Sequence, residues 1–183
     1  MKKVAILLKD GFEELEALSV LDVCRRAGIE GELIGMDSEF VASSHNLIVK
    51  ADRLYDDEIK DFDAVVIPGG MPGAKNLQKD HRVLELVKMM FEANKIVAAI
   101  CAGPIVLQAA GALKNKTVTC YPGFEDELTD ANYKEALVIK DKNIITGKGP
   151  AAGFAFAYEI VEALGIDSEP LKESMQYHYL INH

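Results

Sequence analysis

The chain has 183 residues, of which 49% are hydrophobic and 27% charged, and its formal charge is −9. This is the composition of a folded globular protein, and we expect one domain spanning residues 1–183. The negative charge disfavours nucleic acid and anionic membranes as partners, and no apolar run reaches the ~18 residues that a membrane-spanning helix needs.

Short β-rich runs alternate with helical patterns along the chain. The predicted strands are 4–8, 32–36, 64–67, 96–100, 117–121, 136–139 and 143–146, with a short strand or hairpin arm over 43–49. The predicted helices are 13–27, 81–93, 104–110, 150–164 and 169–179, and a glycine- and proline-rich connection precedes residue 81. This alternation predicts an α/β fold with βαβ units, a mostly parallel sheet and helices on both faces.

In such sheets, ligands bind beyond the carboxyl ends of the strands. Four loops at that edge have an unusual composition, and we expect them to meet there. They are residues 10–16, 68–74, 101–104 and 147–150.

Cys101 stands where a predicted strand turns abruptly into a helix. Ala102 and Gly103 are small enough for a tight turn, and Pro104 suits a first helical position because it has no amide proton. This is the layout of a nucleophile elbow, with sulfur in place of the hydroxyl oxygen. The helix dipole and free amides favour a thiolate, so we predict a reactive Cys101.

The Gly69-Gly70 turn supplies a second feature of this edge. One of its amides, together with the amide of Ala102, is placed to stabilise an oxyanion. The run 68–74 lacks the patterns of phosphate and dinucleotide loops, and the run 147–150 fits a tight packing turn better than an anion site.

The other two cysteines are expected to be inert. Cys24 lies on the apolar stripe of the first helix (Ala17, Val20, Leu21, Cys24 and Ala27), and Cys120 also fits a small buried side chain. Three cysteines without CxxC spacing, and only five apolar residues after the first three positions, predict a reducing cytoplasm rather than secretion.

The first helix opens with an acidic turn. Glu13 and Glu16 are three residues apart, so they share one side of the helix, and that side overlaps the apolar stripe. A carboxyl group drawn toward a core has a raised pKa and can stay protonated. Such a group can hydrogen-bond a thiolate or move a substrate proton, and we assign this role to Glu16. Glu14 is expected to complement the helix dipole at the surface.

A neighbouring histidine is the usual activator of a thiol, but none of His45, His81, His178 and His183 adjoins Cys101 in sequence. We expect His81 and His183 to face solvent. Whether His45 or His178 folds back toward the cysteine stays open. No metal-ligand spacing occurs, so we expect neither a metal nor a cofactor.

Four motifs in this order resemble the DJ-1/PfpI superfamily, and most closely its DJ-1/ThiJ branch. They are Glu13-Glu14-Leu15-Glu16, Ile67-Pro68-Gly69-Gly70, Ala98-Ala99-Ile100-Cys101-Ala102-Gly103-Pro104 and Gly147-Lys148-Gly149-Pro150. The resemblance covers essentially the whole chain. It implies a flavodoxin-like sandwich, related to class I glutamine amidotransferase domains, that forms homodimers with Glu13 and Arg26 near the contact.

The resemblance also implies roles for the site residues. Cys101 matches the family's reactive cysteine and Glu16 the glutamate whose protonated carboxyl contacts it, while Gly70 and Ala102 match the oxyanion amides. The implied activities are cofactor-free glyoxalase, a debated deglycase, oxidative-stress sensing through a sulfinate, and chaperone action. The protease branch has histidine directly after the cysteine, where this chain has Ala102, so proteolysis is disfavoured.

One departure concerns the position before Pro122. DJ-1 proteins with glyoxalase activity commonly have a histidine there, and this chain has Tyr121. Tyrosine, with an ordinary pKa of ~10, is a poor base at neutral pH. The substitution weighs against efficient glyoxalase turnover and leaves oxidation of Cys101 untouched.

Two hypotheses of different classes follow. In the first, the protein is an enzyme whose Cys101 and Glu16 act on small 2-oxoaldehydes, with Tyr121, Gly70 and Ala102 facing the substrate. In the second, it is a redox sensor or chaperone that responds to oxidation of Cys101. A non-catalytic domain with a remnant site is the weakest alternative.

Overall fold

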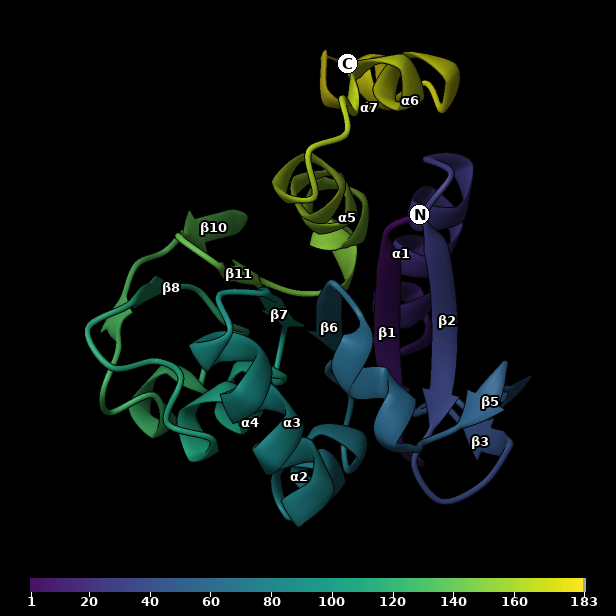
Figure 1. Ribbon diagram of the computed structural model, residues 1–183. Helices are drawn as coiled ribbons and strands as arrows, with labels where there is room; N and C mark the ends of the chain where they lie inside the picture. The colour runs from purple at the N-terminus through teal and green to yellow at the C-terminus, as the bar shows by residue number, and fades with distance from the viewer. Residues whose placement is uncertain (183) are drawn as a thin grey trace.

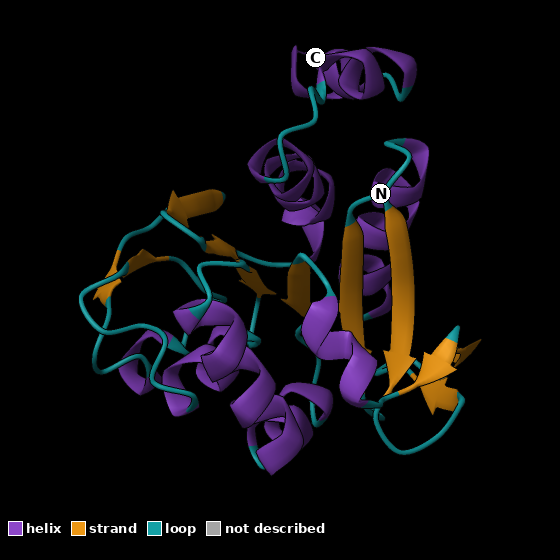
Figure 2. Cartoon of the chain, in the orientation of Figure 1, coloured by secondary structure: helices purple, strands orange, loops and turns teal. Residues whose placement is uncertain are grey.

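The computed structural model describes residues 1–182 and has a seven-stranded central sheet (Figures 1 and 2). Its strands are β1 (Lys3–Leu8), β2 (Glu30–Gly35), β5 (Arg53–Leu54), β6 (Ala64–Ile67), β7 (Ile96–Ile100), β10 (Val138–Asp141) and β11 (Ile144–Gly147). They lie in the order β10-β11-β7-β6-β1-β2-β5, and every neighbouring pair is parallel except β10 with β11. The expected mostly parallel α/β fold is confirmed.

Helices cover both faces of this sheet. Helices α1 (Glu14–Arg26) and α5 (Gly153–Ala163) share one hydrophobic cluster, and α2 (Gly73–Gln78), α3 (His81–Glu92) and α4 (Pro104–Ala109) share the other. The C-terminal helices α6 (Glu169–Ser174) and α7 (Tyr177–Asn182) lie at the end of the molecule away from the arrowhead of β2 (Figure 1). Short 3-10 turns occupy Asp57–Asp61, Glu125–Glu127 and Pro150–Ala152.

The central strand β1 shows why the apolar run forms a strand buried on both sides. Val4, Ile6 and Leu8 pack into the cluster with α1 and α5, whereas Ala5 and Leu7 pack into the cluster with the other helices. All five side chains are fully buried. The period of two places successive residues on opposite faces, and only an apolar run can satisfy both.

The predicted strands 64–67 and 96–100 are confirmed at both ends. The predicted strand 117–121 is wrong beyond its first two residues, because only β8 (Thr117–Val118) is a strand. This strand pairs with β9 (Asn132–Tyr133) outside the main sheet. The amide of Thr119 instead donates to the Thr146 hydroxyl at 2.9 Å, and that of Tyr121 to the Cys101 carbonyl at 2.9 Å.

Three further expectations were imprecise. The predicted helix 169–179 breaks into α6 and α7 because Gln176 has a left-handed φ of 59°. Residues 43–47 form the turn of a hairpin whose strands, β3 (Phe40–Ala42) and β4 (Ile48–Lys50), flank them. The glycine- and proline-rich connection contains the unforeseen α2. His183 lies outside the described residues.

The chain order of the strands places the site. From β1 the chain builds β2 on one side, and it then returns to build β6, β7 and β11 on the other. The order therefore reverses between β1 and β6, where parallel sheets form a crevice at their carboxyl ends. The amide of Glu13 donates to Gly69, and that of Cys101 to Gly147, so all four expected loops do meet there.

Candidate active site

Cys101 connects the end of β7 to the start of α4. Its φ is 63°, in the left-handed region that few residues other than glycine adopt. Its own amide donates to the Gly147 carbonyl at 2.9 Å, and the next turn closes through Gly103, whose amide donates to Ile100 at 2.8 Å. These bonds hold the chain in a sharp turn and leave the thiol half-buried at the edge of the sheet.

Glu16 reaches the same point from the first turn of α1. Its side chain is fully buried, its Oε2 accepts the amide proton of Gly69 at 2.7 Å, and its Oε1 makes no hydrogen bond within residues 1–182. The helix start and the apolar stripe behind it direct this carboxyl inward. A buried carboxyl with one unused oxygen is available to a substrate or to the neighbouring sulfur.

Gly69 is the residue on which the site converges, and the sequence did not single it out from Gly70. A Cβ atom there would lie 2.7 Å from both the Cβ of Cys101 and Oε2 of Glu16, and 3.0 Å from the amide nitrogen of Ala102. Only glycine lets these groups approach so closely.

The sulfur of Cys101 has three polar neighbours. The backbone amides of Gly70 and Ala102 donate toward it, and the Glu16 carboxyl interacts with it from the side. Gly70 has a φ of 86°, and a side chain there would strike the turn that begins α1. The structure thus brings together Cys101, Glu16, Gly70 and Ala102, the four residues expected at the reactive centre.

Burial controls the protonation of this pair. Desolvation raises the pKa of Glu16 to about 7, outweighing the hydrogen bond from Gly69. Desolvation and the Glu16 charge likewise raise the pKa of the Cys101 thiol, although the amides of Gly70 and Ala102 lower it. Burial of this pair therefore opposes the expected thiolate, whereas the amides of Gly70 and Ala102 favour it.

Tyr121 approaches the site through its backbone. Its ring is half-exposed and lies against Gly149, where a Cβ would be 3.2 Å from a ring carbon. The ring borders a cavity of about 290 Å³ that Leu137 and Lys148 also line. No interaction joins its hydroxyl to the sulfur within the described chain.

The histidines left open by the sequence do not pair with Cys101. The Nδ1 of His45 lies 3.0 Å from Glu14, which is mostly buried rather than at the surface as expected, and the Nε2 of His178 lies 3.1 Å from Glu169. Glu13, Glu14 and His45 form a group of possible metal ligands. The sequence concealed this group because 31 residues separate His45 from Glu14.

Glu13 and Arg26 occupy opposite ends of α1. Glu13 precedes the helix and accepts a hydrogen bond from the Ser44 hydroxyl at 3.1 Å. Arg26, in the last turn, pairs with Asp22 at 2.7 Å on the surface. Neither interacts with the sulfur.

The remaining cysteines are buried and free. Burial raises the pKa of Cys24 to about 12 and that of Cys120 to about 11. Neither has the amide and carboxyl neighbours of Cys101.

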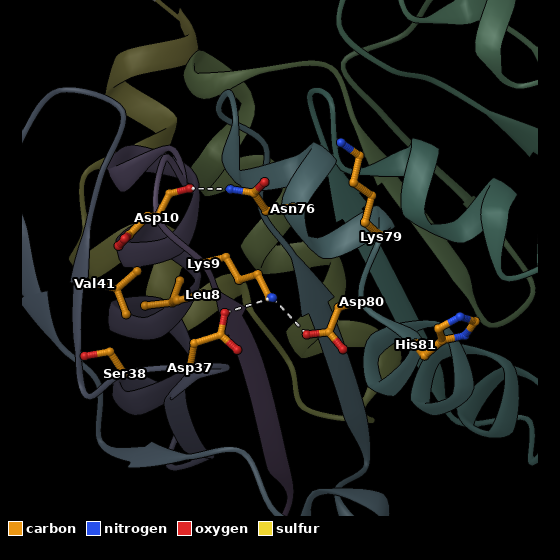
Figure 3. Close-up of a pocket in the computed structure, with 10 residues that line it drawn as sticks. All are labelled: Leu8, Lys9, Asp10, Asp37, Ser38, Val41, Asn76, Lys79, Asp80 and His81. Atoms are coloured by element: carbon orange, nitrogen blue, oxygen red, sulfur yellow. Dashed lines mark hydrogen bonds and ion pairs between the residues drawn. The ribbon is translucent and has the colours of Figure 1, made fainter.

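A larger cavity of about 540 Å³ lies at the same edge, beyond the end of β1 (Figure 3). Lys9 projects into it between Asp37 and Asp80, while Lys79 and His81 point away from this group. Cys101 does not line this cavity. Within residues 1–182, no helix combines the length and apolar character required to cross a bilayer.

Comparison with known proteins gives a consistent result. A model of the DJ-1/PfpI family matches residues 2–163. The Parkinson disease protein 7 homolog of Danio rerio is 39% identical over 169 residues, and the glutathione-independent glyoxalase DJR-1.2 of Caenorhabditis elegans is 37% identical over 168, each match covering 89% of both chains. The crystal structure of a DJ-1 superfamily protein from Salmonella typhimurium is similar with a TM-score of 0.89 at 36% identity, covering 98% of both chains.

Proposed function

This chain belongs to the DJ-1/PfpI family, and from that membership and the contact between Cys101 and Glu16 we propose that it converts small 2-oxoaldehydes such as methylglyoxal to hydroxy acids without a cofactor. The relative named a glutathione-independent glyoxalase supports this substrate class. One observation carries the proposal: a cysteine in a left-handed turn whose sulfur faces two amides and a carboxyl of pKa about 7.

The first step is addition of sulfur to the aldehyde. At neutral pH, Glu16 is present in both protonation states, and its carboxylate accepts the thiol proton as Sγ bonds to the aldehyde carbon. The carbonyl bond opens to a hemithioacetal oxyanion. The amides of Gly70 and Ala102 support the negative charge as it passes from sulfur to oxygen.

The second step moves hydrogen between adjacent carbons. Glu16 first gives the thiol proton to the oxyanion and so becomes a carboxylate again. It then removes the proton from the former aldehyde carbon and returns it to the former ketone carbon, while the hydroxyl proton passes from the first oxygen to the second. One carbon is thereby oxidised and the other reduced within the same molecule. The resulting thioester reacts with water, which releases lactate and restores the thiol. The net change is addition of one water, and it needs no external oxidant. A deglycase-type reaction, which releases an aldehyde adduct, would begin with the same attack by the Cys101 sulfur.

The test follows methylglyoxal loss and lactate formation in the wild type, Cys101→Ser and Glu16→Gln. We expect both variants to lose turnover, and Cys24→Ser, as the matched buried cysteine, to retain it. Wild-type turnover no faster than that of Cys101→Ser would exclude the enzyme.

The second candidate is a sensor or chaperone switched by oxidation of Cys101, and the position of Tyr121 favours it. A tyrosine whose ring lies against Gly149 supplies no base at neutral pH. Two equivalents of hydrogen peroxide would carry the sulfur to sulfinate with release of two waters, and Glu16 would hydrogen-bond the product. Mass spectrometry should find the sulfinate on Cys101, and equal oxidation of Cys120 would contradict the idea. The three free cysteines fit the cytoplasmic location that we also propose.

We further propose that two copies pair through the face where α1 meets α5. Leu15 and Phe154 are exposed there. The two helices lie close together, because a Cβ atom at Gly153 would be 3.3 Å from the Leu15 carbonyl oxygen. The family resemblance places Glu13 and Arg26 near this contact. Sedimentation of the wild type and of Leu15→Asp should show a dimer that the variant weakens, and a monomeric wild type would reject the pairing.

A further inference from the structure

A second group of ionisable side chains lies where the β3–β4 hairpin meets the start of α1. Glu13 and Glu14 come from the helix start, and His45 comes from the hairpin turn. One potential ligand atom from each lies within 4.8 Å of the other two. The Nδ1 of His45 is 3.0 Å from Glu14 Oε1 and 3.7 Å from Glu13 Oε2.

These separations suit a single small cation. Nitrogen and oxygen ligands about 2.0–2.2 Å from a tetrahedral zinc ion lie roughly 3.3–3.6 Å from one another. The two distances from His45 bracket that range, and the two carboxylate oxygens lie within 4.8 Å of each other, so rotations of the glutamate side chains would bring all three atoms onto one ion.

Burial supplies an independent reason to expect a cation here. Glu13 is only 8% exposed, although it carries a carboxyl group. The Oε2 of Glu14 is completely enclosed and has no hydrogen-bond partner within residues 1–182. The Glu14 side chain is 17% exposed, so its carboxylate is only partly solvated, and a cation bound at the carboxyl would offset that charge.

The two elements that carry these ligands are firmly joined. The amide of Gly11 donates to Ala42 at 2.8 Å, and that of Ser44 donates to Phe12 at 2.8 Å. Phe12 and Ser43 also form a parallel bridge. The ligands are therefore held in place before any ion arrives, which lowers the cost of ordering them.

We propose that Glu13, Glu14 and His45 form a binding site for a divalent transition metal ion of the zinc type, with a remaining position open to water. An imidazole nitrogen with two carboxylates is a donor set for such ions, whereas magnesium and calcium prefer oxygen ligands alone. The site is separate from the Cys101 thiol and does not depend on the function proposed above.

The test measures binding of Zn²⁺ by calorimetry and of Co²⁺ by its visible absorption, using the full chain. We expect one ion per chain, with magnesium failing to compete at equal concentration. His45→Gln and Glu14→Gln should each weaken binding by about tenfold or more. His178→Gln is the matched control, because His178 also pairs with a glutamate, and its affinity should equal that of the wild type.

A measurement on the unaltered protein guards against misfolded variants. Zn²⁺ should shift the imidazole NMR signals of His45 and leave those of His81 and His178 in place. Binding that is lost in Cys101→Ser but kept in His45→Gln would place the ion on the thiol and overturn the proposal. Absence of a stoichiometric ion would also overturn it and would leave the group as a hydrogen-bonded fastening of the hairpin only.

Discussion

The carboxyl edge of the sheet carries two polar groups that differ in how their charges are balanced. At the end of β1, Lys9 forms ion pairs of 2.9 Å with both Asp37 and Asp80, and its side chain is only 15% exposed (Figure 3). At the end of β7, Cys101 faces Glu16, and no cation offsets the carboxylate. The first group lines a large cavity with paired charges, and the second leaves Glu16 Oε1 without a hydrogen-bond partner within residues 1–182.

The directions of the pKa shifts express this difference. Burial alone would raise the pKa of Asp80, but bonds from Arg82 and Lys9 lower it overall, so its charged form is the stable one. For Glu16 and Cys101, burial prevails and favours the neutral forms. A paired charge at a cavity therefore indicates structure, whereas an unpaired carboxyl beside a thiol indicates chemistry. The larger cavity is not the better candidate.

The largest expected effect separates the two groups by activity. Cys101→Ser should reduce methylglyoxal turnover at least about 100-fold, because a serine hydroxyl with a much higher pKa is a far weaker nucleophile. Asp80→Ala should keep most of the turnover per folded molecule. Comparable losses in both variants would mean that the ion-paired cavity takes part in the reaction.

Stability should show the reverse order. Asp80→Ala removes one of the two carboxylates that pair with Lys9 and the acceptor for the Arg82 amide at the start of α3, and we expect a loss of about 2 kcal/mol in urea unfolding. Because the pKa of Asp80 is lowered on folding, this stabilisation is present above the ordinary carboxyl pKa and disappears as the pH falls below it. A loss under about 1 kcal/mol at pH 7 would show that the pair contributes little.

The pH dependence of Glu16 has the opposite sign. The folded chain keeps its proton between the ordinary pKa of 4.5 and about 7, so unfolding becomes easier as the pH rises through that window. Glu16→Gln removes this ionisation and keeps an acceptor for the Gly69 amide. We expect the free energy of unfolding of the variant to exceed that of the wild type by about 2 kcal/mol at pH 8 and to equal it near pH 4.5. Parallel stability curves would mean that Glu16 ionises normally.

The sequence could predict the positions of Cys101 and Glu16 because its signals are local. A strand that ends at Cys101 before Pro104, and a glutamate on the same side as an apolar stripe, each place one residue without knowledge of the other. Their meeting at Gly69 depends on the strand order, in which β6 lies between β1 and β7. The alternation of elements predicts such an order only in outline.

The burial of Cys101 and the short β8 could not be predicted in the same way. Desolvation depends on how completely α1 and the Gly69 turn enclose the sulfur, and no spacing of residues reports that. Likewise, Thr119 looks like a strand residue, but its amide is taken by the side chain of Thr146, 27 residues away. In both places long-range contacts act against a local pattern.

The smallest expected effect tests whether pairing, rather than position, distinguishes the residues of the large cavity. Lys79 lines the same cavity as Lys9, yet it is exposed and makes no ion pair within residues 1–182. Lys79→Ala should therefore change the free energy of unfolding by less than about 0.5 kcal/mol and leave turnover unchanged. Lys9→Ala removes one of the two cations that pair with Asp80 and should be clearly destabilising. Equal effects of the two substitutions on the free energy of unfolding in urea would mean that the ion pairs of Lys9 are no stronger than its contacts with solvent. The contrast between the two polar groups would then depend on Cys101 and Glu16 alone.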